Sequence, residues 1–164
     1  MRPSFRPIRE KDILILTRTY QRNKLADFSS RFTPHAYTAH GAIKSKLHQW
    51  LAIQHKGTLI GSLWVEKAKP SSKTGKLGIL IHYKKFWSRG IGRYAILMNL
   101  PFFRRRLSLS RIHLNVRCKN KRAINCYLKC GFRTIRKNTK SIQNINISYF
   151  TMQHDGIGRG PSPV

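Results

Sequence analysis

The stretch that decides the fold is LGILIHYKKFWSRGIGR, residues 77–93. It opens with a short apolar run, Leu77 to Ile81, which predicts a strand. The glycines of Trp87-Ser88-Arg89-Gly90-Ile91-Gly92 predict a turn. Apolar residues then recur at helical spacing as far as Leu100, which predicts a helix. The stretch therefore predicts a strand, a glycine-rich turn and a helix in succession.

Such a turn has a chemical use. Main-chain N–H groups at a helix N-terminus lack acceptors within the helix, and the helix dipole favours an anion there. Glycine has no Cβ, so the main chain can approach that anion closely. A lone Gly-x-Gly is also typical of an ordinary connection between a strand and a helix. The rest of the chain must decide between these two readings.

The charge of the chain is its most unusual property. Its 164 residues include 33 Lys and Arg against 5 Asp and Glu, giving a formal net charge of +28. Such a surface attracts polyanions, and nucleic acid, ribosomes and acidic lipid surfaces are the candidates. The alternative is general basicity, as in a host with a basic proteome or a salt-rich compartment.

The sequence also argues against several classes of protein. No apolar run approaches the roughly 20 residues of a transmembrane helix, and the N-terminus lacks the apolar core of a signal peptide. We therefore expect a cytoplasmic protein without a membrane span. The cysteines, Cys118, Cys126 and Cys130, lack paired Cys-x-x-Cys spacing. They indicate reduced packing residues, with neither a disulfide framework nor a metal site.

Periodicity places further elements along the chain. Strands are predicted at 5–8, 50–55, 59–67, 111–117, from 132 to 135 and at 143–153. The second and third of these form a hairpin around Lys56-Gly57. Helices are predicted at 10–20, at 35–47 with an interruption at Gly41, and at 120–130 with Asn120 as N-cap. Residues 22–32 are compatible with a short helix or a loop.

Other signals mark the ends of elements. Pro101 is expected to kink or end the helix that follows the glycine turn, and residues 137–141 are expected to form a basic turn. Residues 1–155 are expected to form a single domain, followed by a flexible tail at 156–164. Helices and strands mix without strict alternation, which favours α/β or α+β architecture with a mixed sheet.

Separated segments of the chain resemble one family. FWSRGIGRYAI resembles the acetyl-CoA pyrophosphate loop of the GNAT N-acetyltransferase superfamily, commonly Arg/Gln-x-x-Gly-x-Gly/Ala. NVRCKNKRAINCYLKCGF is similar to a later segment of the family, and FRPIREKDI to its first strand and helix. In the later segment the matching residues are Asn120, Ala123, Tyr127, Lys129, Gly131 and Phe132. The resemblance implies a central mixed, mostly antiparallel sheet flanked by helices and splayed between its fourth and fifth strands.

The resemblance also implies a binding site for acetyl-CoA. Pantetheine is expected to pair with the main chain of Leu80, Ile81 and His82, whose N–H groups would polarise the thioester carbonyl. Asn120 would help to anchor CoA, although it is also explained as an N-cap. Trp87 departs from the family pattern, which prefers Arg or Gln there. The expected pyrophosphate loop comprises Trp87, Ser88, Arg89, Gly90, Ile91, Gly92 and Arg93.

Catalytic roles follow from the same resemblance. Tyr127 would be the general acid that protonates the departing thiolate, although a tyrosine on an apolar helix face is also typical of a core. Many relatives supply a Glu near the fourth strand as general base, where this chain has Lys76. Glu66 is then the nearest acid and the candidate base, or else a surface partner of a lysine. His82 and His113 are further titratable groups.

The resulting functional hypothesis is acetyl transfer from acetyl-CoA to a primary amine by direct attack in a ternary complex. The amine could belong to a protein N-terminus, an aminoacyl-tRNA or a small molecule, and the positive charge disfavours a free polyamine. The alternatives are a non-catalytic nucleic-acid-binding protein with the same fold and an aminoacyl-tRNA-acetylating toxin. The charge predicts association with RNA or ribosomes. A homodimer is also expected, because relatives in the family often dimerise.

Overall fold

A computed structural model describes residues 2–156, apart from the side chain of Ile142. Of the predicted tail at 156–164, all but Gly156 lies outside the described residues. No helix within the described part is long and apolar enough to cross a membrane. The elements are β1 (Ser4–Pro7), α1 (Glu10–Arg22), η1 (Leu25–Asp27), α2 (His35–His40), β2 (His48–His55), β3 (Thr58–Glu66), β4 (Thr74–Ile81), η2 (Lys84–Phe86), α3 (Ile91–Leu107), β5 (Arg111–Arg117), α4 (Lys121–Lys129), β6 (Arg133–Ile142) and β7 (Ile145–Asp155).

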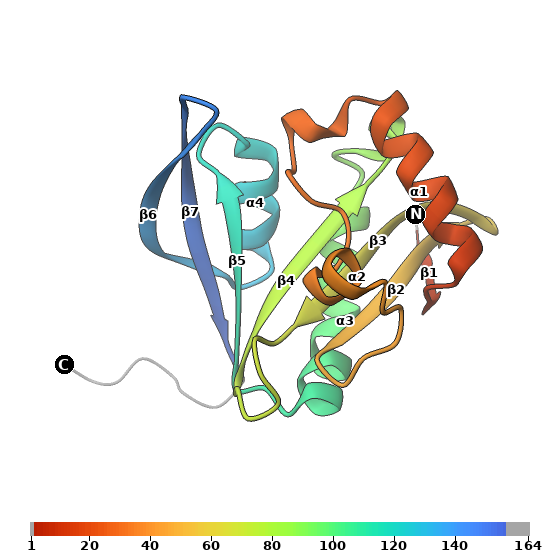
Figure 1. The fold of residues 1–164 in the computed structure, drawn as a ribbon, viewed down its shortest axis with the longest axis horizontal. Helices are drawn as coiled ribbons and strands as arrows, with labels where there is room; N and C mark the ends of the chain where they lie inside the picture. Colours follow the sequence, from red (N-terminus) through yellow and green to blue (C-terminus); the bar gives the residue numbers. More distant parts are fainter. Residues whose placement is uncertain (1, 157–164) are drawn as a thin grey trace.

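The strands of the described chain form one seven-stranded sheet, in the order β1-β2-β3-β4-β5-β7-β6. Neighbouring strands are antiparallel except β4 and β5, which are parallel. These two pair only where Thr74–Lys76 lies against Arg111–His113, and beyond that point they diverge (Figure 1). The predicted mixed, mostly antiparallel sheet, splayed between its fourth and fifth strands, is confirmed.

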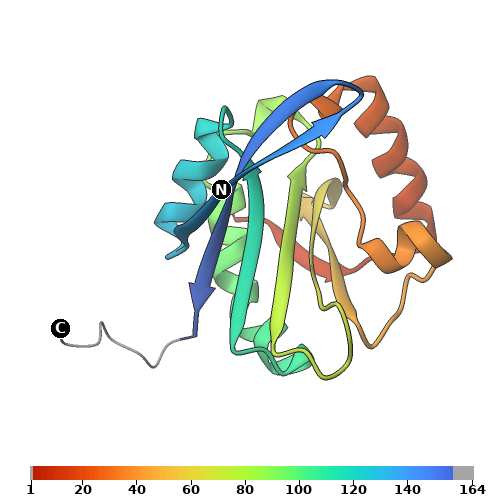
Figure 2. The same cartoon turned by 60° about the vertical axis from the view of Figure 1, so that its left-hand side comes forward.

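Helices cover both faces of this sheet, with α3 and α4 on one face and α1 and α2 on the other (Figure 2). Strand side chains alternate between the two faces. Ile112, Leu114 and Val116 of β5 belong to the core beneath α3. Trp50 and Trp64 of β2 and β3 belong to a second core with α1. The faces therefore differ in composition, and a side chain's parity along its strand decides which face it reaches.

Pro101 was predicted to kink or end its helix, and it does not end it, because α3 continues to Leu107. Proline removes one helical N–H and crowds the preceding turn. That cost is offset by burial beyond the proline, where Phe103 is 0% exposed and Leu107 3%. Tertiary packing thus holds the last turns of α3 in place.

Two further element boundaries need correction. The helix predicted at 35–47 ends at His40, because Gly41 has a φ of +66° and closes it as a left-handed cap. The basic turn predicted at 137–141 lies within β6. The turn is formed instead by Gln143 and Asn144, whose φ values are +49° and +63°. A two-residue turn with both φ values positive matches the twist of a hairpin.

Candidate active site

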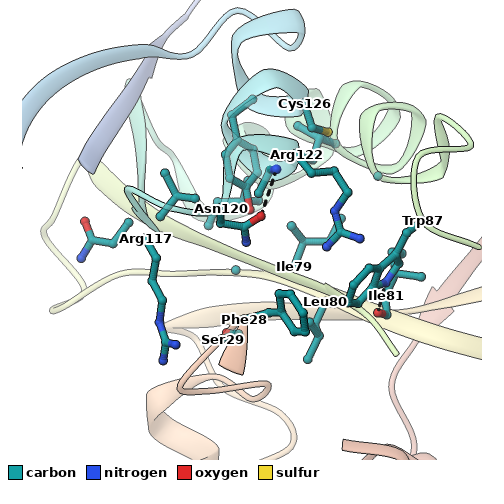
Figure 3. A pocket seen from close by; sticks show the side chains of 18 of the residues that line it. Phe28, Ser29, Ile79, Leu80, Ile81, Trp87, Arg117, Asn120, Arg122 and Cys126 are labelled. Carbon is teal, nitrogen blue, oxygen red and sulfur yellow. Dashed lines mark hydrogen bonds between the residues drawn. The ribbon is translucent and has the colours of Figure 1, made fainter. Parts of the chain in front are cut away.

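A cleft of about 600 Å³ opens where β4 and β5 separate (Figure 3). The start of α3 and much of α4 line one side of it. The segment after η1 lies opposite α4 (Figure 3), and the β6–β7 hairpin also contributes to the lining. The length of β4 that does not pair with β5, from Leu77 to Ile81, passes between them together with Lys76. Several predicted residues therefore meet here, although they come from three separate parts of the chain.

The main chain of β4 presents alternate residues to the cleft. The His82 N–H donates to Ile60 of β3 at 2.8 Å, and its carbonyl accepts from the Asn23 side chain at 2.7 Å. Because the bonding direction alternates along a strand, Leu80 faces β3 as His82 does, whereas Ile79 and Ile81 face the open edge. The predicted pairing of pantetheine with the main chain of Leu80 and His82 therefore does not fit this geometry. The main chain at the open edge belongs to Ile79, which was not predicted, and to Ile81, which was.

The predicted pyrophosphate loop forms the N-terminus of α3. Tyr94 donates its N–H to the Gly90 carbonyl at 2.9 Å, the first hydrogen bond of this helix. The N–H groups of Ile91, Gly92 and Arg93 therefore have no acceptor within the helix. Gly90 has a φ of +77°, which a residue with a Cβ adopts only at a cost. The loop thus offers donors to an anion, and its glycine makes the geometry possible.

Most of the predicted loop lines the cleft, namely Trp87, Ser88, Gly90, Ile91, Gly92 and Arg93. Arg89 is exposed and does not line it. The Trp87 indole Nε1 donates to the Ile81 carbonyl at 2.8 Å. Its ring meets Phe28 edge-on with centroids 4.8 Å apart, and the Arg122 guanidinium carbon lies 3.5 Å from its centroid. Trp87, the residue that departs from the family pattern, therefore connects the loop to the edge of β4 and to α4.

Helix α4 supplies the predicted Asn120 and Tyr127. The Asn120 side chain accepts the Ala123 N–H at 3.2 Å, which confirms it as the N-cap. Both Asn120 and Tyr127 line the cleft. Burial raises the pKa of Tyr127, with smaller contributions from the nearby Cys126 and Cys130 thiols. Its phenol therefore stays protonated at neutral pH and is able to donate a proton.

Glu66, the candidate base, does not line the cleft. One carboxylate oxygen is paired with the Arg31 guanidinium, and the other accepts the His35 N–H at the start of α2. These contacts anchor the segment between η1 and α2. His82 and His113 also lie outside the lining. The structure thus brings the general-acid candidate into the cleft and leaves the three candidate bases outside it.

Cations crowd this cleft. Its lining contains no Asp or Glu among the described residues. The basic members of the lining are Arg31, Lys76, Arg93, Arg117, Arg122, Lys129 and Lys140. Burial lowers the pKa of Lys76, and the positive charges of Arg31 and Lys140 lower it further. The cleft is therefore built to receive negative charge.

Sequence reasoning missed Arg122, Phe28 and the cluster around Lys76. Arg122 did leave a signal: it stands in the first turn of α4, where the helix dipole disfavours a cation. Such a residue needs another reason for its place, and stacking on Trp87 supplies one. Phe28 and Lys140 left no comparable signal, because they reach the cleft only through the tertiary fold.

With this geometry in place, comparison with known proteins identifies the class. The family model of the acetyltransferase (GNAT) domain matches residues 2–133. The chain belongs to the GNAT family of acetyl-CoA-dependent N-acetyltransferases, as its motifs predicted. A comparison with curated proteins finds no match.

Solved structures agree on the fold. Spermidine N-acetyltransferase from Vibrio cholerae, in complex with CoA and spermine, has a TM-score of 0.76 at 16% identity, covering 93% of this chain and 95% of its own. A GNAT-family acetyltransferase from Streptococcus pneumoniae has a TM-score of 0.74 at 19% identity, covering 93% and 98%. A domain from Methanocaldococcus jannaschii has a TM-score of 0.69 at 18% identity, covering 93% and 97%.

The cleft fits the family's cosubstrate. The free N–H groups of Gly92 and Arg93 and the Arg122 guanidinium are suited to a pyrophosphate. The open edge of β4 offers the Ile79 main chain to the amides of pantetheine. Acetyl-CoA is therefore the cosubstrate to expect here on chemical grounds as well as by family.

Proposed function

We propose that this protein transfers an acetyl group from acetyl-CoA to a primary amine by direct attack, with both substrates bound together. One observation carries the proposal: the N-terminus of α3, the open edge of β4 and Tyr127 all border a single cleft. An enzyme of this kind has to place an anion, a thioester and a proton donor within reach of one another.

Each part has a distinct task. When bound, acetyl-CoA supplies an acetyl thioester whose carbon–sulfur bond breaks as the acetyl group passes to nitrogen. The N–H groups of Ile91, Gly92 and Arg93 hold the pyrophosphate. The Ile79 and Ile81 main chain aligns the pantetheine arm. Tyr127 keeps a proton on its hydroxyl for the departing sulfur.

The amine must arrive without its extra proton, because an ammonium has no lone pair for attack. Glu66 is not assigned this task, since both its oxygens are engaged elsewhere. We propose instead that solvent accepts the proton. The requirement is mildest for an amine of low pKa, such as an α-amino group near 7.7–8.0.

Calorimetric titration with acetyl-CoA tests the first half of this proposal. We expect binding in the micromolar range. Affinity should fall when Arg93 is replaced by Gln, because this removes a positive charge from the cleft lining while keeping the main-chain N–H. Absence of binding at millimolar concentration would overturn the proposal. Thiol release in the presence of an amine panel tests the second half, and binding without release for any amine would favour a non-catalytic role.

A second candidate function is nucleic-acid binding, favoured by the net charge of +28. It predicts affinity for RNA that falls steeply with salt and that persists in a Tyr127→Phe variant. An enzyme that also binds RNA would combine both behaviours, as expected of an aminoacyl-tRNA-acetylating toxin. Association with RNA or ribosomes and a homodimer stay predictions.

A further inference from the structure

The alternation of side chains along β4 and β5 determines which residues face the side of the cleft opposite α3 and α4. Leu114 and Val116 of β5 point into the core beneath α3, so the alternate residues Asn115 and Arg117 point to the other face. Lys76 of β4 lies on that same face as Trp64, because Trp64 is one residue from Val65 and Lys76 one residue from Leu77, both in the α3 core. These side chains line the part of the cleft that is left for the acceptor.

The β6–β7 hairpin completes this acceptor side. Tyr149 is paired with Arg117 in the sheet register, and the Lys140 ammonium lies 5.8 Å from the Tyr149 ring centroid. Asn138 donates to Thr151, which in turn donates to Asn115 at 3.0 Å. Of these residues, Asn115, Lys140 and Tyr149 line the cleft, so this side of it combines a polar, a cationic and an aromatic side chain.

Some of the basic side chains on this side are paired with other groups of the protein, and others are not. Arg31 is paired with Glu66, and Arg117 donates to the main-chain carbonyls of Ala26 and Asp27. Lys76 and Lys140 make no hydrogen bond or salt bridge within the described residues. Burial and the charges of Arg31 and Lys140 lower the pKa of Lys76. The lining of the cleft has no carboxylate. Glu66 lies opposite Lys76 in the register of β3 and β4 and acts to raise its pKa, but this carboxylate is already paired with Arg31. The two ammonium groups thus share a space in which cations outnumber the nearby carboxylate.

We propose that the acceptor is an amine carrying a carboxylate or phosphate group, which Lys76 and Lys140 bind. This inference rests on the proposed acetyl transfer and names its substrate class. An anion relieves the repulsion between the two lysines, whereas a polyamine would add to it. Trp64 and Tyr149 line the same cleft, so an apolar spacer between the amine and its anionic group would meet aromatic side chains there.

The same charges assist the reaction without a general base. Positive groups near a bound ammonium favour its neutral form and lower its pKa. The proton leaves to solvent before attack, as the proposed function requires. Lys76 thus takes the place of the family's Glu with the opposite effect: it promotes loss of the proton through its field. Lys76 and Lys140 are in this sense specificity residues.

Matched pairs of acceptors test the proposal in the full-length protein at saturating acetyl-CoA. O-Phosphoethanolamine is compared with ethanolamine, and β-alanine with its amide, by thiol release. We expect kcat/KM at least about tenfold higher for the anionic member of one pair. The phosphate pair and the carboxylate pair separate the two sources of negative charge. Spermidine is the cationic acceptor in the same assay.

Variants assign the preference to the lysines. Lys76→Gln and Lys140→Gln should each lower the ratio of kcat/KM between anionic and neutral acceptors by roughly tenfold, and Lys140→Glu should shift preference toward spermidine. Lys11→Gln, which removes an exposed charge on α1, should leave the ratio unchanged. A merely structural role would lower both members of a pair equally, and that result would overturn the assignment.

The outcomes separate the two proposals. If acetyl-CoA does not bind, both fail. If spermidine or the neutral amines react best, the anionic acceptor is excluded while acetyl transfer stands. If no acceptor reacts, binding decides: O-phosphoethanolamine should bind the CoA-saturated wild type and bind Lys76→Gln at least tenfold more weakly. Equal or absent binding would overturn the inference.

Discussion

The Arg122 guanidinium carbon lies 3.5 Å from the centroid of the Trp87 ring, joining α4 to the loop before α3 across the mouth of the cleft. The same indole also packs edge-on against the Phe28 ring, and its Nε1–H donates a hydrogen bond to the Ile81 carbonyl. Such a stack is worth about 0.5–2 kcal/mol. It holds a cation near the free N–H groups of α3 before any ligand arrives.

Loss of this cation should weaken acetyl-CoA binding. We expect Arg122→Gln to raise the dissociation constant about tenfold, because both the stack and a charge beside the pyrophosphate are lost. Calorimetry at two salt concentrations measures it, with a shallower salt dependence in the variant. Arg105→Gln is the matched control, since Arg105 is exposed near the far end of α3. Equal affinities for wild type and Arg122→Gln would contradict the role.

Tyr127→Phe separates chemistry from binding. The variant lacks only a hydroxyl, so acetyl-CoA should bind with unchanged affinity while kcat falls roughly 100-fold or more, the scale of a lost general acid. Because burial raises the pKa of Tyr127, the wild type should show no loss of kcat from its ionisation up to about pH 10. Rapid-quench or thiol-release assays measure both effects.

Tyr37→Phe is the control for that experiment. Tyr37 packs against Trp50 in the core beneath α1 and lies outside the cleft. Its removal should leave kcat close to the wild-type value. A Tyr127→Phe enzyme that keeps full kcat would show that solvent protonates the sulfur instead.

Gly78 is required by the ring that covers it. A Cβ at this position would lie 2.1 Å from Trp64 Cζ2. We therefore expect Gly78→Ala to lower the free energy of unfolding by about 1–3 kcal/mol, the usual cost of overpacking. It should also raise the acceptor KM, since Trp64 lines the acceptor side, while leaving acetyl-CoA affinity unchanged.

A double-mutant cycle supplies the control. Phe lacks the second ring of Trp, so Gly78→Ala should cost less in a Trp64→Phe background than in the wild type. Urea unfolding of the four proteins measures the coupling. Strictly additive costs would mean that another contact makes glycine necessary at this position.

The sequence predicted those features that depend on neighbours along the chain. The α3 N-terminus with Gly90 and the Asn120 cap are local devices, and each was found where the pattern placed it. The end of α3 was missed because burial of Phe103 and Leu107 outweighs the local effect of Pro101. That burial is a property of the assembled core.

The site divides in the same way. Tyr127 was located through its motif, whereas the contact between Trp87 and Arg122 joins positions with no shared periodicity. Glu66 was assigned by its nearness in sequence, yet Arg31 and the start of α2 occupy its carboxylate. Pairing of the few acids present with basic neighbours is decided by tertiary structure, so charge counts alone did not reveal it.

The imidazole of His82 should make stability depend on pH. This side chain is 0% exposed, and its Nδ1 lies 2.9 Å from the Thr19 hydroxyl of α1. Burial lowers the pKa of His82 to about 4 from its ordinary 6.5. The unfolded chain therefore takes up a proton as the pH falls below 6.5 while the folded chain does not. Stability is fully present above pH 6.5 and is lost progressively toward pH 4, by up to about 3 kcal/mol.

Urea unfolding between pH 7 and pH 4.5 measures this loss. In His82→Gln the slope of the unfolding free energy against pH should fall by about one proton near pH 5, even though the variant is less stable at pH 7. His40→Gln, at the exposed end of α2, is the control variant. Since His113 and His154 also have lowered pKa values through burial, a residual slope is expected. An unaltered slope in His82→Gln would mean that the buried imidazole is protonated in the folded protein.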